Sequence, residues 1–203
     1  MIPVAEQPEP PGFDERVRIP GQKFLSEAQN FSPLKWDGKE YWRKVIPDLR
    51  EAYGGVCAYC AFWMAPTENA SVDHFIPRSV NAALAYEWSN FRLASPKINS
   101  AKGTKDVLDP FQIEYEWFVL DFSSLMVKPN NGLESYIFNK IQDTINRLKL
   151  NKQDPWIDYR FLLVSKYIQR RINFEELKEL APFIAYELER QNLKDDIASI
   201  LRV

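Results

Sequence analysis

The 203-residue sequence has little of several residue types on which whole protein classes depend: it contains one histidine, His74, and two cysteines, Cys57 and Cys60. Two cysteines cannot form the disulfide framework of a small secreted protein, and the short gap between them favours metal binding or packing instead. No apolar run approaches the roughly 20 residues that a helix needs to cross a bilayer. The N-terminus has neither the basic start nor the apolar core of a signal peptide. These absences predict a cytoplasmic protein with no membrane segment.

Other patterns are absent as well. None of the seven glycines forms part of a Walker-type phosphate loop, so the chain itself is not expected to hydrolyse nucleotides. No internal repeat is present. The composition, with 45% hydrophobic and 27% charged residues, is that of an ordinary globular protein.

The formal net charge of −2 does not indicate binding to nucleic acid through bulk charge. The distribution of charge is more informative, because residues 78–105 are locally basic, and residues 147–171 form a second basic block before an acidic tail. That second block is equally compatible with an ordinary solvated surface. The basic residues of the first block are Arg78, Arg92, Lys97, Lys102 and Lys105.

Three regions are predicted along the chain. Residues 1–36 are rich in proline and suggest an extended N-terminal arm. Residues 37–110 contain a helix, for which Asp37 is a candidate cap, followed by short β-like runs. In this region Pro47 either kinks the helix or starts a second one.

Residues 111–203 are predicted to be mainly helical. A strand is expected between Tyr115 and Phe122, because the run is aromatic and β-branched. One apolar stripe at helical spacing then follows, and Asp154 and Asn173 are candidate caps of two further helices. The residues of the stripe are Ile137, Ile141, Ile145 and Leu148.

The single histidine lies in the one stretch that suggests catalysis. Asp73 precedes His74, Asn90 follows a loop, and Asn99 stands three residues before Lys102. Histidine accepts a proton near neutral pH, and Mg²⁺ prefers oxygen ligands such as those of Asp73 and Asn99. Because neighbouring strand residues point to opposite faces, Asp73 and His74 can share a site only where the strand ends or twists.

These residues resemble the HNH, or ββα-metal, endonuclease family, in the Asp-His/Asn/Asn variant found in CRISPR effector nucleases. The resemblance covers Cys57, Cys60, Asp73-His74, Asn90, Asn99 and Lys102-Gly103, about a quarter of the chain. It implies an α+β fold, with a small ββα-metal core embedded in a mainly helical chain. It also implies roles: His74 as general base, Asp73 and Asn99 as ligands of one Mg²⁺ or Mn²⁺ ion, Asn90 as the residue that fixes the loop and orients the histidine, and Lys102 as a phosphate contact.

The zinc-binding half of the family pattern is incomplete. Many relatives carry a second Cys-x-x-Cys, but the corresponding positions here are Ser95 and Ile98. A structural zinc site needs four Cys or His ligands, so Cys57 and Cys60 are expected to pack as small apolar residues rather than bind zinc.

The sequence therefore predicts a metal-dependent DNA endonuclease. Arg78 and Arg92 are candidate phosphate contacts or plain surface residues, and Lys97, Lys102 and Lys105 could add to the same surface. Residues 86–90 and 148–151 also resemble HNH proteins of anti-phage defence loci, including the Septu type, which implies an ATPase partner encoded nearby. The alternative is a non-catalytic nucleic-acid-binding or assembly module that keeps the fold. Oligomeric state and the choice between DNA and RNA are left open.

Overall fold

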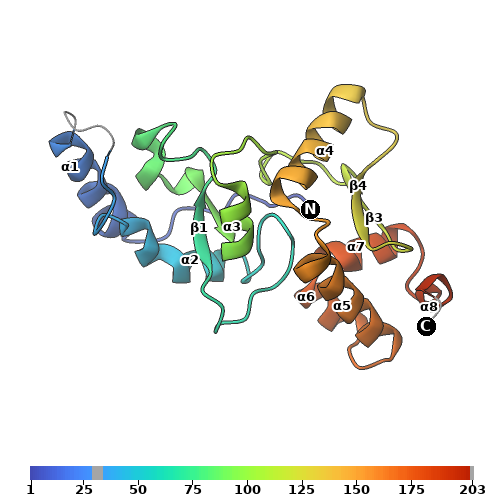
Figure 1. Cartoon of the computed structure of the whole chain (residues 1–203). Helices are drawn as coiled ribbons and strands as arrows, with labels where there is room; N and C mark the ends of the chain where they lie inside the picture. Colours follow the sequence, from blue (N-terminus) through green and yellow to red (C-terminus); the bar gives the residue numbers. More distant parts are fainter. Residues whose placement is uncertain (29–33, 202–203) are drawn as a thin grey trace. The chain divides into compact units, whose positions relative to one another are not determined.

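The structure of this chain is a computed structural model that describes residues 1–28 and 34–201 (Figure 1). These residues form two compact units. One unit, here called the ββα unit, contains Ala5–Cys57 and Met64–Thr104. The other, the helical unit, contains Met1–Val4, Ala58–Trp63 and the chain from Lys105 onward. The α+β class predicted from the sequence is confirmed.

The centre of the ββα unit is a two-stranded antiparallel sheet followed directly by a helix. Strand β1 (Ser71–His74) pairs with β2 (Phe91–Ala94), with Asp73 opposite Arg92. Helix α3 (Pro96–Lys102) begins at once because Ser95 accepts a hydrogen bond from the Ile98 amide and Pro96 suits the first turn. The loop between the strands contains two short 3-10 turns, Ala82–Tyr86 and Trp88–Asn90.

The N-terminal part of the ββα unit is helical where the sequence predicted an extended arm. A π-helical turn (Asp14–Arg18) continues into α1 (Ile19–Glu27), and Val17 of the turn is fully buried. The arm prediction is therefore wrong for this segment; Pro20 lies in the first turn of α1, directly after the π-helical turn. Gly21 lets α1 approach the Tyr86 ring closely, since an added Cβ would lie 2.2 Å from Cγ of that ring. Residues 29–33 of the predicted arm lie outside the described residues.

Two helical elements separate this segment from β1. A 3-10 turn (Tyr41–Val45) leads into α2 (Ile46–Ala52). Pro47 lies at the start of α2, which confirms the predicted alternative in which this proline starts a second helix. The prediction that Asp37 caps the first element is wrong, because Glu40 occupies the cap position and no side chain caps the turn.

The helical unit contains a second antiparallel pair and the remaining helices. Strand β3 (Phe118–Asp121) lies within the predicted run, and it pairs with β4 (Met126–Pro129), which the sequence did not predict. Helix α4 (Ser135–Leu148) buries Ile141, Ile145 and Leu148, as the stripe predicted. The later helices are α5 (Asp158–Ile168), α6 (Phe174–Leu180), α7 (Pro182–Arg190) and α8 (Ile197–Leu201).

The two predicted caps in this unit are Asn173 and Asp154. Asn173 caps α6, and its side chain and that of Glu176 form a reciprocal capping box. Asp154 has the extended backbone angles of an N-cap residue within the helical turn Gln153–Ile157, and the helical backbone after it continues into α5, as predicted. Across residues 1–28 and 34–201, no helix has the length and apolar character that crossing a membrane requires.

Candidate functional site

A cleft of about 910 Å³ lies within the ββα unit beside the carboxyl end of β1. It brings together three of the residues that the sequence predicted to form the site, Asp73, His74 and Asn99. Strand β1 ends at His74, which is where the sequence argument required it to end if Asp73 and His74 were to face one site. Trp36, Trp42 and Arg78 also line the cleft, and the sequence did not predict the two indoles there.

His74 is held as a neutral imidazole. Its Nε2 lies 2.9 Å from the carbonyl oxygen of Ala85, which can only accept, so Nε2 carries the proton and Nδ1 the lone pair. The rings of Trp42 and Phe91 meet the imidazole edge-on, at centroid distances of 4.8 and 5.3 Å. Burial lowers the pKa of His74 to about 4, and the charges of Arg78 and Lys102 act in the same direction. A neutral histidine with a fixed tautomer is the form that a general base requires.

Asn90 fixes the loop that carries the Ala85 carbonyl. Its Oδ1 accepts from the Ile76 amide at 2.8 Å, and its Nδ2 donates to the carbonyls of Ile76 and Leu84, each at 3.0 Å. The side chain is 5% exposed and does not line the cleft. Its geometry is that of a residue acting through the loop rather than on a substrate.

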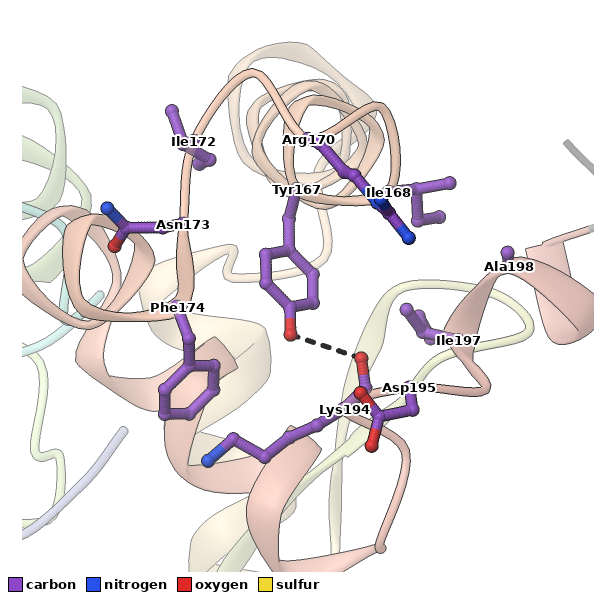
Figure 2. A pocket seen from close by; sticks show the side chains of 10 residues that line it. All are labelled: Tyr167, Ile168, Arg170, Ile172, Asn173, Phe174, Lys194, Asp195, Ile197 and Ala198. Atoms are coloured by element: carbon purple, nitrogen blue, oxygen red, sulfur yellow. Dashed lines mark hydrogen bonds between the residues drawn. The ribbon is translucent and has the colours of Figure 1, made fainter.

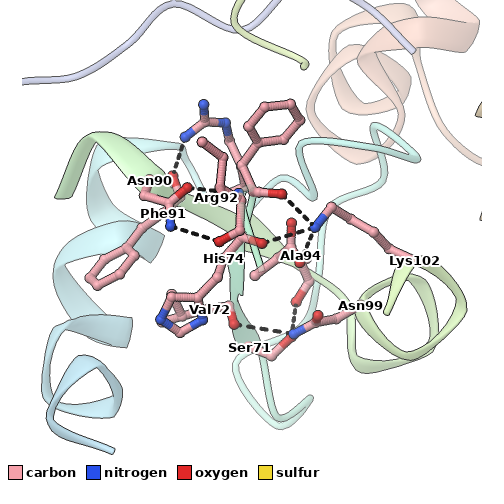
Figure 3. Close-up of polar contacts among 12 residues, drawn as sticks. Ser71, Val72, His74, Asn90, Phe91, Arg92, Ala94, Asn99 and Lys102 are labelled. Carbon is pink, nitrogen blue, oxygen red and sulfur yellow. Dashed lines mark hydrogen bonds and ion pairs between the residues drawn. The ribbon is translucent and has the colours of Figure 1, made fainter. Parts of the chain in front are cut away.

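Asn99 joins α3 to β1. Its Nδ2 donates to Ser71 Oγ and to the Val72 carbonyl, both at 3.1 Å (Figure 3). Both bonds use the amide nitrogen, so Oδ1 is the atom with which Asn99 could bind a hard cation. Ser71 has a supporting role that no pattern in the sequence indicated.

Asp73 and Lys102 form a buried ion pair. Lys102 Nζ lies 3.0 Å from Asp73 Oδ1, and it also donates to the carbonyls of His74 and Phe75 (Figure 3). The side chains are 3% and 0% exposed. This corrects the interpretation of Lys102 as a phosphate contact, because its three donors are all used and none of its surface is accessible.

The predicted basic surface is divided. Arg92 is 3% exposed and donates to the carbonyls of Ser89 and Phe91, so its guanidinium does not reach a phosphate on the surface, which corrects that prediction too. Lys97 is exposed on α3, and Lys105 is exposed but belongs to the helical unit. Arg78 is half-buried in the cleft, 4.5 Å from the ring centre of Trp42 and 5.0 Å from that of Trp36. Arg78 thus places a cation in the cleft that His74 lines, and Arg43 lines the same cleft.

The donor atoms in the cleft match a hard divalent ion in type, but they are few. Mg²⁺ is usually held by one or two carboxylates, with water and substrate oxygens completing its shell. Asp73 would supply one carboxylate and Asn99 a neutral amide oxygen, and the Lys102 ammonium lies beside that carboxylate. Among residues 1–28 and 34–201, no three His, Cys, Asp or Glu side chains cluster closely enough to hold a metal.

Cys57 and Cys60 are both buried, and they belong to different units. Cys57 Sγ accepts a hydrogen bond from the Ser95 amide, at the cap of α3. Cys60 lies in the helical unit, where it interacts electrostatically with Arg160.

The helical unit has a hollow of its own, of about 550 Å³ (Figure 2). The Tyr167 hydroxyl donates to the Lys194 carbonyl, and the Lys194 ammonium lies 3.6 Å from the centre of the Phe174 ring and pairs with Glu189. Because these polar groups are used within the wall, the hollow is not part of the candidate site.

Comparison with known proteins adds a weak relationship to this geometry. No protein-family model matches the chain. The chain is similar to the Septu protein PtuB of Bacillus thuringiensis, with 25% identity over 175 residues that cover 82% of this chain. It spans 64% of the length of that relative. The similarity agrees with the resemblance to Septu-type proteins seen in residues 86–90 and 148–151.

Proposed function

We propose that this chain is a metal-dependent endonuclease that hydrolyses DNA phosphodiester bonds and acts in bacterial anti-phage defence. One observation carries the chemical part: His74 is neutral, its tautomer is fixed by the Ala85 carbonyl, and it shares a cleft with Asp73 and Asn99. The similarity to a Septu protein supports the biological part.

In the proposed reaction His74 acts as general base. Its Nδ1 lone pair would take a proton from the attacking water while Nε2 remains bonded to Ala85. Asp73 and Asn99 would hold one Mg²⁺ or Mn²⁺ ion, and Arg78 would offer a cation to the phosphate. When bound, such an ion neutralises charge on the phosphoryl group and on the departing oxygen. The Trp42 ring packs edge-on against the imidazole and restricts its orientation.

We also propose that activity depends on an ATPase partner encoded nearby, as the Septu resemblance implies. The chain has no Walker-type loop of its own. A nuclease whose activity is controlled by a separate ATPase would need no such loop. Assays should therefore be run with and without the product of the neighbouring gene.

The test is cleavage of supercoiled plasmid in Mg²⁺ or Mn²⁺ by the wild type and three variants. His74→Ala should reduce the rate by about 10²–10⁴-fold and leave DNA binding unchanged, because only the base is removed. Asp73→Asn should instead raise the metal concentration needed for half-maximal cleavage, and Asn99→Ala should do so more mildly. Asn131→Ala, in an exposed turn of the helical unit, is the matched asparagine control. Cleavage by His74→Ala at the wild-type rate would overturn the proposal.

The second candidate function is a non-catalytic nucleic-acid-binding module. The buried Asp73–Lys102 pair favours it, because an ammonium already neutralises the proposed ligand. This alternative predicts DNA binding without cleavage in every metal and with the partner present. It also predicts that His74→Ala and the wild type bind DNA equally.

A further inference from the structure

We propose that Lys102 is a positioning residue: it fixes Asp73 and the carboxyl end of β1, and thereby the backbone that carries His74. This inference rests on the proposed function for its catalytic consequence. Its structural core is the contact between Lys102 and three oxygen atoms, which exists whether or not the chain is a nuclease.

The contacts of Lys102 are those of a buried anchor. The ammonium donates to Asp73 Oδ1 at 3.0 Å, to the His74 carbonyl at 2.9 Å and to the Phe75 carbonyl at 3.0 Å. Three donors meet three acceptors, so the hydrogen-bonding capacity of the group is exhausted. Gly103 follows with φ of +52° and ends α3, so Lys102 reaches the strand from the last helical residue.

Lys102 works together with Asn99, which lies almost one turn earlier on α3. Asn99 holds Ser71 and Val72, and Lys102 holds the next three residues along the chain. Two side chains of α3 therefore form hydrogen bonds along the whole of β1. Lys102 holds both the proposed ligand Asp73 and the backbone of the proposed base His74.

The charge of Lys102 matters as much as its length. Asp73 is 2% exposed, and a buried carboxylate needs a counter-ion. Lys102 is that counter-ion in the absence of metal. Removing the ammonium while keeping the carboxylate should leave a buried negative charge that attracts any small cation able to enter the cleft.

The experiment is a double-mutant cycle read by thermal unfolding, with Mn²⁺ as the probe. Lys102→Met keeps the side-chain length and should lower the melting temperature by several degrees in EDTA. Asp73→Asn with Lys102→Met should recover part of that loss. Mn²⁺ should raise the melting temperature of Lys102→Met more than that of the wild type, and should give the double variant no such extra rise. Lys23→Met, an exposed lysine of α1, is the matched control.

A phosphate contact would behave differently. In that case Lys102→Met would have the melting temperature of the wild type. Its affinity for DNA would be lower, and that affinity would depend less on salt concentration. Unchanged melting, or additive effects of the two substitutions, would overturn the proposal. If Lys102→Met does not fold, the neutral double variant still tests the pair, because its folding shows that the loss of the ammonium beside a charged Asp73 was responsible.

For the reaction, Lys102→Met should lower kcat and leave KM for DNA near the wild-type value. The opposite split, a raised KM with unchanged kcat, would contradict positioning and indicate substrate binding. The melting cycle uses no nuclease activity, so it can succeed where the proposed function fails. If the wild type cleaves DNA but the double-mutant cycle shows no coupling, only the role proposed for Lys102 would be rejected.

Discussion

The described residues contain two antiparallel strand pairs that differ in what they bury. In β3–β4 burial alternates along each strand, and the buried residues, Phe118, Leu120, Val127 and Pro129, are all apolar. In β1–β2 almost every residue is buried, including Asp73, His74 and Arg92. The first pattern is what an antiparallel sheet with one solvated face requires; the second is not.

Each buried polar group of β1–β2 has a specific partner, and that partner offsets the free-energy cost of removing the group from water. Asp73 is paired with Lys102, His74 with the Ala85 carbonyl, and Arg92 with two backbone carbonyls. Burying such groups does not stabilise a fold as apolar residues would. The difference between the two pairs is therefore that β1–β2 buries polar groups that each need a partner, whereas β3–β4 buries apolar groups that need none.

The largest expected effect on the free energy of unfolding comes from protonating His74 at low pH. Its folded pKa of about 4 is below the ordinary value of 6.5, so the unfolded state binds the proton more readily. The associated stability is fully present above pH 6.5 and is lost as the pH falls towards 4. From the size of the shift, the loss is about 3 kcal/mol at pH 4. Urea unfolding in EDTA should show this loss in the wild type and not in His74→Gln.

The absence of other histidines makes this measurement direct. A single set of imidazole NMR signals belongs to His74, so its titration can be followed without assignment. A midpoint near 6.5 in the folded protein would mean that the ring is solvated, and would remove the distinction drawn between the two strand pairs.

The sequence predicted elements well where the signal is local. The stripe of α4 and the Asn173 cap depend on neighbouring residues, and both were found. Asp37 has an equally suitable side chain, but the first turn after it begins with Glu40 at the cap position. The helix after the first prolines was missed because its stability comes from packing against Tyr86, which is distant in sequence.

The candidate site was predicted in its residues but not in its contacts. The order Asp73, His74, Asn90 and Asn99 was recognisable as a motif, and the structure places three of these in one cleft. The burial of Lys102 and Arg92 could not be predicted, because a basic residue near a motif looks the same in sequence whether it faces solvent or a carbonyl. The same holds for the indole wall formed by Trp36 and Trp42.

An asparagine near each strand pair offers a matched comparison of intermediate size. Asn90 binds both the amide and the carbonyl of Ile76, and Asn151 binds both the amide and the carbonyl of Val127. Replacing either with Ala should cost about 2 kcal/mol in urea unfolding, since buried backbone groups lose their partners. Only Asn90→Ala should also shift the NMR titration of His74, because only Asn90 supports the loop that carries Ala85.

Equal shifts in both variants would mean that the histidine reports on general stability. No shift in either would separate Asn90 from the site and leave it as a structural residue of the loop. Under the proposed function, Asn90→Ala should also slow plasmid cleavage, whereas Asn151→Ala should not.

The smallest effect is expected at Asp121, the acidic residue of the β3–β4 pair. Hydrogen bonds from Lys128 and then from Ser123 and Ser124 hold the pKa of Asp121 well below its ordinary value. A lowered folded pKa contributes stability that is present above about pH 4 and lost as the pH falls further. Because Lys128 is half-exposed, the contribution should be about 1 kcal/mol or less.

Urea unfolding of the wild type and Asp121→Asn at pH 5 and pH 3 tests this contribution. The difference between their free energies of unfolding should be smaller at pH 3 than at pH 5. His74 loses its stability between pH 6.5 and 4, and Asp121 below that range, so the two strand pairs should respond to acid in separate windows. A gap that stays constant with pH would show that Asp121 acts through packing rather than charge.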